Sequence, residues 1–184
     1  MQGNLFEQGQ DIHPLFFQQD VNTDVTGDWI DMKHYARGYI LFIKAGTEDV
    51  DDLAVQVQQA TDNAAAGAKA LSVARCWYKT GTMTSQTVWT AVTVGGASSP
   101  APDDLLGVGS ALPTGATRVV DDVGTSALYL LVEVKAEDMD SNNGFDHVTL
   151  FVEGDNLDNA CLASALWIGS QGFLMQNVPP SPLG

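Results

Sequence analysis

The residues that come nearest to a chemical motif are three oxygen-bearing side chains at alternate positions, Asp138, Asp140 and Asn142. Oxygen ligands at this spacing suit Ca²⁺, which proteins bind through carboxylate and amide oxygens. The EF-hand loop would then require glycine at position 143 and an acid at position 149, where the chain has Asn143 and Thr149. The template fails, so we expect a solvated acidic turn and leave open whether Asp138 and Asp140 bind an ion.

Other residue types that perform chemistry are scattered along the chain. The three histidines, His13, His34 and His147, show no metal-ligand spacing. The run Gly169-Ser170-Gln171-Gly172 is one residue shorter than a nucleophile elbow, and no general base accompanies it. Gly107-Val108-Gly109 lies in a proline-rich stretch without the strand-to-helix context of a phosphate-binding loop. The sequence therefore predicts a protein that is not an enzyme and has no cofactor and no metal site.

The charge balance excludes one class of partner. The chain of 184 residues has 8 Lys and Arg against 23 Asp and Glu, a formal net charge of −15. Affinity for nucleic acid depends mainly on cationic side chains that displace counterions from phosphates. A chain this acidic is repelled by phosphate backbones, so we expect no nucleic-acid partner.

Two segments with strict period-two alternation predict the central strands. Apolar and other side chains alternate over residues 128–135 and again over 147–152. Successive side chains of a strand point to opposite faces, so this pattern indicates strands with one buried face. The acidic, turn-rich segment between them ends in Asn143-Gly144, a pair that tolerates positive φ. We expect two core strands, antiparallel to each other and joined by an acidic loop.

The remaining segments also favour strands. Residues 39–43 form a continuous apolar run, as expected of a central strand covered on both faces. Residues 71–78 and 88–94 alternate, with a turn expected at Gly81-Thr82. Residues 50–60 and 157–168 fit either a helix or a strand, and we favour strands. The expected fold is an all-β, single-domain sandwich or jelly roll of about seven or eight strands.

Two extended ends are expected to flank the domain. Residues 1–19 hold aromatic anchors but keep no period, which indicates an arm that packs on its own domain or on a neighbour. Residues 20–176 would form the domain, with a long exposed loop at 95–116, and the proline-rich residues 177–184 would form a tail. The residues expected to contact a neighbouring molecule are Leu5, Phe6, Ile12, Leu15, Phe16, Phe17, Val178, Pro179 and Pro180.

The cysteines and the first residues indicate the cellular compartment in which the protein is made. Cys76 and Cys161 lie far apart in apolar runs, which favours two buried thiols rather than a disulfide. The first residues lack the basic start and apolar segment of a secretory signal. No run approaches the roughly 18 apolar residues of a membrane span. We therefore expect synthesis in a cytoplasm and no membrane partner.

Three further stretches resemble a known group of proteins. Residues 55–62 with 67–71, residues 139–148, and the opening Gly27-Asp28-Trp29-Ile30-Asp31-Met32-Lys33-His34-Tyr35 are similar to patterns in small structural proteins of tailed bacteriophages. The resemblance covers residues 27 to about 168, apart from the 95–116 loop. Within that group such β-rich chains resemble head decoration (cement) and minor capsid proteins. The resemblance implies a virion component on the capsid surface, often a homotrimer, with no catalytic residues to carry over.

The predicted function is therefore decoration of an assembled phage head, by bridging subunits of the major capsid protein of the same virion, with assembly in the host cytoplasm. Such contacts rely on apolar anchors and extended arms rather than on pockets. Two alternatives stay open. One is a tail or head–tail connector protein. The other is a receptor- or carbohydrate-binding β-sandwich in which Tyr78, Trp77 or Trp89 stacks on a sugar.

Overall fold

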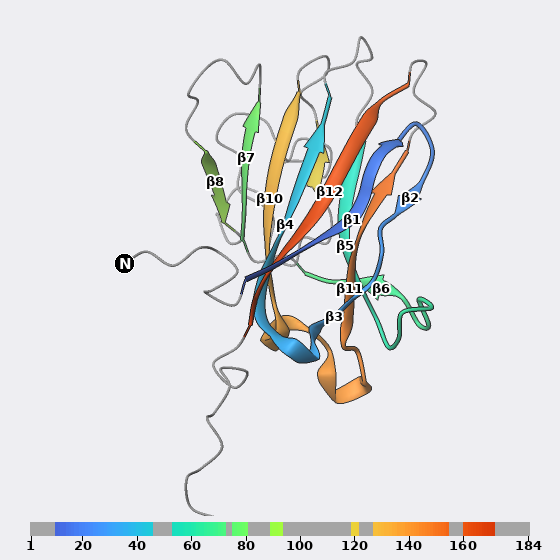
Figure 1. Ribbon diagram of the computed structural model, residues 1–184, viewed down its shortest axis with the longest axis vertical. Helices are drawn as coiled ribbons and strands as arrows, with labels where there is room; N and C mark the ends of the chain where they lie inside the picture. Colours follow the sequence, from blue (N-terminus) through green and yellow to red (C-terminus); the bar gives the residue numbers. More distant parts are fainter. Residues whose placement is uncertain are drawn as a thin grey trace, which may run out of the picture.

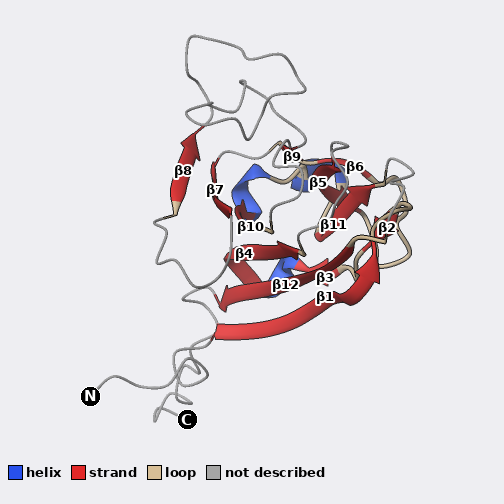
Figure 2. Ribbon diagram, turned by 90° about the horizontal axis from the view of Figure 1, so that it is seen from above, coloured by secondary structure: helices blue, strands red, loops and turns tan. Residues whose placement is uncertain are grey.

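The structure is a computed structural model of the chain, and it describes residues 10–45, 53–72, 75–80, 89–93, 119–121, 127–154 and 160–171. These residues form two facing antiparallel sheets (Figures 1 and 2). The prediction of an all-β sandwich is confirmed. The described part of the chain contains no helix capable of crossing a membrane.

The first sheet has six strands in the order β1-β12-β4-β10-β7-β8 and curves along one side of the molecule (Figure 2). Each strand is antiparallel to its neighbours, which satisfies the backbone groups of the inner strands. The strands are β1 (Gln10–Asp20), β12 (Leu162–Gln171), β4 (Tyr35–Lys44), β10 (Leu128–Lys135), β7 (Arg75–Thr80) and β8 (Thr90–Thr93).

The second sheet is built around β11 and β5, and its other strands are only two or three residues long. Its order is β2-β11-β5-β6, with β3 also paired to β11 and β9 to β5. Three short 3₁₀ turns, η1 (Met32–His34), η2 (Ala136–Asp138) and η3 (Ser141–Asn143), lie at one end of the sandwich. The strands are β2 (Val25–Thr26), β3 (Ile30–Asp31), β5 (Leu53–Ala60), β6 (Lys69–Ala70), β9 (Val119–Asp121) and β11 (His147–Glu153).

The core lies between the two sheets and follows the alternation in the sequence. Every second residue of β10 points inward and is buried, as are the facing residues of β11. The largest fully buried side chain is Trp167 on β12. Its indole packs against Gly38, where a Cβ atom would approach Trp167 Cζ2 to 2.1 Å. The core residues with no exposed surface include Ile40, Phe42, Leu128, Leu130, Val148, Leu150, Val152 and Trp167.

Both ambiguous segments are strands, as expected: residues 53–60 form β5 and residues 162–171 form β12. Pairing of the two strands around residues 75–80 and 90–93 is also confirmed. Cys76 and Cys161 are both buried and are not joined in a disulfide, as predicted. Burial raises the pKa of the Cys76 thiol to about 12. The turn expected at Gly81-Thr82 and the loop at 95–116 lie outside the described residues.

Two expectations differ from the structure. The strands at 128–135 and 147–153 do not pair, because β10 belongs to the first sheet and β11 to the second. The acidic segment between them crosses from one sheet to the other through η2 and η3, closing at Gly144 with φ of 82°. In addition, residues 10–19 were expected to be extended without forming a strand, whereas they form most of β1, the edge strand next to β12. This part of the expected arm packs on its own domain, which is one of the two alternatives.

Candidate interaction surface

The outward face of the first sheet is apolar across four adjacent strands. One row joins Trp77, Leu131, Leu41 and Leu166 on β7, β10, β4 and β12, because each residue pairs with the next across the sheet. Each of these side chains is partly exposed and points away from the core. Two further rows lie on either side of this one, through Tyr39, Ile168 and Ile12 and through Tyr129 and Ile43.

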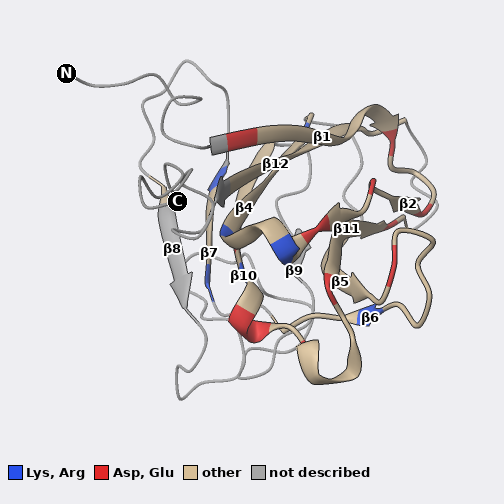
Figure 3. Cartoon of the chain, turned by 60° about the horizontal axis from the view of Figure 1, so that its bottom comes forward, with Lys and Arg blue, Asp and Glu red and all other residues tan. Residues whose placement is uncertain are grey.

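Charged side chains flank the central row of this face, and one of them, Glu133, pairs with Tyr39 within an outer row. Arg37 and Glu133 form an ion pair at 3.4 Å near one end of β4 and β10. Arg75 and Lys79 lie on β7, whereas β12 carries no charged residue at all (Figure 3). An apolar centre with a charged rim is the usual composition of a protein–protein interface.

Two aromatic side chains and their neighbours form a hollow within the apolar face. Tyr39, Trp77, Trp89 and Leu131 line a depression of about 340 Å³. The Tyr39 and Trp77 rings lie 6.3 Å apart, and the Arg75 guanidinium lies 5.8 Å from the Trp77 ring. Of the three aromatic residues predicted to stack on a sugar, Trp77 and Trp89 line this hollow, whereas Tyr78 points into the core.

The β1–β12 edge carries the most exposed apolar groups. Phe17 is 65% exposed, Leu162 49% and Ile12 43%. Ile12 lies beside Ile168 in the sheet, and Leu162 lies opposite Asp20. Among the described residues, the only other large apolar side chain exposed in this way is Trp89.

The structure divides the predicted contact residues into three groups. Ile12 and Phe17 are exposed on β1, where a neighbour could reach them. Leu15 and Phe16 are buried in the core of their own domain, with Phe16 packed against Phe42. The outward rows of β4, β10 and β12 were not predicted as contacts, although the continuous apolar run at 39–43 signalled a strand with two apolar faces. Leu5, Phe6, Val178, Pro179 and Pro180 lie outside the described residues.

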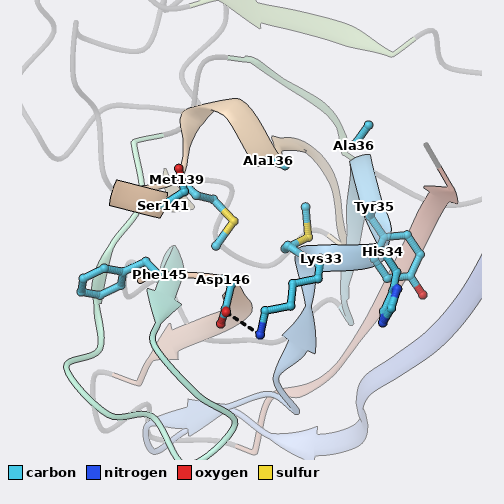
Figure 4. Close-up of a pocket in the computed structure, with 10 residues that line it drawn as sticks. Lys33, His34, Tyr35, Ala36, Ala136, Met139, Ser141, Phe145 and Asp146 are labelled. Carbon is cyan, nitrogen blue, oxygen red and sulfur yellow. Dashed lines mark ion pairs between the residues drawn. The ribbon is translucent and has the colours of Figure 1, made fainter. Parts of the chain in front are cut away.

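A second concavity lies at the end of the sandwich where the 3₁₀ turns gather. It measures about 420 Å³ and is lined mostly by apolar side chains, with Lys33 and Asp146 pointing toward each other at 2.7 Å (Figure 4). The hydrogen bond from Lys33 lowers the pKa of Asp146 and raises that of Lys33. Its lining residues are Met32, Lys33, His34, Tyr35, Ala36, Ala136, Met139, Ser141, Phe145 and Asp146.

The acidic segment that resembled a Ca²⁺ loop is engaged in contacts of its own. Asp140 pairs with Lys69 at 2.5 Å and accepts two hydrogen bonds from Asn143. The hydrogen bond from Lys69 is the main reason why the pKa of Asp140 is lowered. Lys69 also lies 4.0 Å from the centre of the Phe145 ring. Within the ranges that the structure describes, no group of His, Cys, Asp and Glu side chains is placed to hold a metal ion.

The histidines do not converge on one site. His13 lies 3.3 Å from the Tyr35 hydroxyl, which also donates to Asp11. Burial, and then the nearby carboxylate of Asp11, raise the pKa of Tyr35. His147 contacts Asp146 on the second sheet, and His34 is exposed on η1. These contacts build local hydrogen bonds rather than a shared catalytic arrangement.

Comparison with known proteins does not assign the chain to a family. No family model matches it, and no curated protein matches it. One similar solved structure is the crystal structure of the SPBc2 prophage-derived protein YomS. It shares 8% sequence identity with a TM-score of 0.42, over 87% of this chain and 95% of that chain. The neighbour is thus a phage-derived protein, and a similarity this low says nothing by itself about function.

Proposed function

We propose that this chain is a structural protein of a tailed-phage virion that decorates the outer surface of the assembled head. The proposal rests on the phage-like sequence stretches and on one structural observation. That observation is an apolar outward sheet face that continues into the exposed β1–β12 edge. Monomeric proteins rarely expose large contiguous apolar areas, and those that do commonly use them to bind other proteins.

The proposed partners are the major capsid protein of the same virion and further copies of this chain in a homotrimer. Decoration adds buried apolar area across seams between capsid subunits. Each Å² of apolar surface removed from water contributes about 25 cal/mol, so a modest contact repeated over a shell is enough to stabilise it. No catalysis is involved in this role. The strong negative charge would keep decorated particles dispersed.

The test is binding of the purified protein to assembled, undecorated heads, followed by co-sedimentation. Phe17→Ser and Ile12→Ser together should weaken saturable binding at least tenfold, because both remove exposed apolar surface from the edge. Gln56→Ser on the opposite sheet is the matched control and should bind as the unchanged protein does. Binding of the edge variant at full strength would contradict the role of this edge, and failure of all proteins to bind would contradict decoration.

The alternative role of a tail or connector protein predicts a different location on the same particle. Electron micrographs of particles labelled with an antibody against this chain distinguish the two roles. Label distributed over the whole head supports decoration. Label confined to one vertex or to the tail supports the alternative.

A further inference from the structure

We propose that the aromatic hollow formed by Tyr39, Trp77, Trp89 and Leu131 is the binding site for the chain's own C-terminal proline segment, residues 178–182. This inference does not depend on the decoration role. It assigns an occupant to a surface that the described part of the chain leaves open, and it assigns a function to the tail.

The chemistry of the hollow suits prolines better than sugars. Three of its four lining residues are aromatic and the fourth is leucine. Aromatic-lined grooves are the surfaces on which proline-rich segments pack, because the rings lie flat against pyrrolidine rings. Sugar sites also need several well-placed polar groups, and here the lining side chains provide only the Tyr39 hydroxyl and the two indole N–H groups.

The tail has the matching sequence. Its last seven residues read Val178-Pro179-Pro180-Ser181-Pro182-Leu183-Gly184. Proline fixes φ near the polyproline II value, so such a segment loses less conformational entropy on binding than other sequences do. The segment contains no charged side chain, so its docking on an apolar surface carries no desolvation cost for a charged side chain.

The length of chain beyond the last strand allows this contact within one molecule. β12 ends at Gln171, which pairs with Tyr35 on β4. The hollow lies about five residues along β4 from that point and about two strands across, which is roughly 20 Å at the usual strand spacings. Residues 172–178 span up to about 23 Å when extended. Gly172, directly after the strand, can adopt the sharp turn that the path requires.

The experiment compares the full chain with a chain ending at Asn177. Removal of the tail should shift tryptophan emission to longer wavelength and raise acrylamide quenching, because Trp77 and Trp89 become more exposed. The signal of the full chain should not depend on protein concentration, since the contact is intramolecular. A signal that appears only as the concentration rises would overturn docking within one molecule.

A peptide of residues 177–184 tests the same site from outside. A short linker holds a tail at an effective concentration on the order of mM, so docking requires the free peptide to bind the shortened chain with Kd below about 1 mM. A peptide with serine at all three proline positions should not bind. Trp89→Ser at an exposed position should abolish peptide binding, whereas Leu166→Ala on the same face, outside the hollow, should preserve it.

Three results would overturn the proposal. One is identical fluorescence of the full and shortened chains. The second is no peptide binding at millimolar concentration. The third is equal binding of the proline and serine peptides, which would mean that the hollow does not select for proline. If a glycan bound in the hollow and the peptide did not, the hollow would be a carbohydrate site rather than a site for the proline segment.

Discussion

The two sheets share one core but present opposite surfaces to the surroundings. The outward residues in the central rows of the first sheet are leucine, isoleucine, tyrosine and tryptophan. On the second sheet, β5 turns Gln56 and Gln58 outward, and β11 turns Phe151 and the fully covered Thr149 to the same side. On the second sheet, Gln58 Nε2 donates to Gln56 Oε1 at 2.9 Å, and Thr149 Oγ1 donates to the Asp28 carbonyl at 3.0 Å. These two outer side chains of the second sheet thus find their hydrogen-bond partners within the same chain.

This difference is not required by folding. The inward residues alternate in the same way on both sheets, so either sheet could have carried polar residues outside without loss of the core. The outer face that is mainly apolar on one sheet and mainly polar on the other is the observation behind the proposed contact of the first sheet. Substitutions on the inner face, on the apolar outer face and at the polar crossing between the sheets should therefore have different effects.

The largest effect is expected from a pair of adjacent leucines on β10. Leu130 points inward and is 0% exposed, whereas Leu131 points outward. Leu130→Ala should lower the free energy of unfolding by about 2–5 kcal/mol, because it leaves a cavity in the core. Leu131→Ala should cost less than about half of that in the isolated protein, since its neighbours leave it partly in water. Urea denaturation measures the loss of unfolding free energy in each variant. Equal losses would mean that the inner and outer faces of β10 are not buried to different extents.

The second effect concerns Cys76, on the inner face of the first sheet. Its pKa is raised to about 12 from 9.0 by burial. The thiolate is the reactive form, so at pH 8 its population should be lowered about 1000-fold. In a Cys161→Ala background, reaction with a disulfide reagent should be slow in native buffer and fast in guanidinium chloride. Fast reaction of the native protein would show that the inner face opens readily.

The third effect concerns the apolar outer face directly. Leu41→Gln together with Leu166→Gln replaces two neighbours in its central row. Binding of an apolar fluorescent dye should fall by roughly half or more, because such dyes report exposed apolar area. The Gln56→Ser variant on the second sheet is the control and should leave dye binding unchanged. An unchanged signal in the Leu41 and Leu166 variant would show that this face does not present a continuous apolar surface.

The sequence predicted the individual strands better than their partners. Period-two alternation at 128–135 and 147–152 reports which side chains are buried, and both strands are present. It does not report which sheet a strand joins, so the two were expected to pair although they lie in opposite sheets. β1 was missed because its register shifts near Phe16 interrupt the alternation. The outer face was hidden for a related reason, since an apolar run cannot distinguish a face covered by its own chain from one left for a partner.

The smallest effect is expected at the crossing between the sheets, where Lys69 on β6 pairs with Asp140 and Lys33 pairs with Asp146. The pKa of each of these carboxyl groups is lowered from 3.8 by the hydrogen bond from its lysine. A lowered folded-state pKa means that the unfolded chain binds protons first as the pH falls. The stabilisation is therefore complete above about pH 5 and is lost as the pH falls through 3.8 toward the folded-state values.

The Asp140→Asn variant isolates this contribution from the other carboxylates. Urea midpoints of the variant and the unchanged protein should differ most between pH 5 and 7 and converge below pH 3.8. The Lys69→Gln variant should reproduce the same pH dependence, because it removes the donor that lowers the pKa of Asp140. Because these groups are exposed, the difference should also shrink at high salt. A constant difference at every pH would mean that Asp140 stabilises the crossing through its shape and neutral hydrogen bonds, and that charge plays no part in joining the two sheets there.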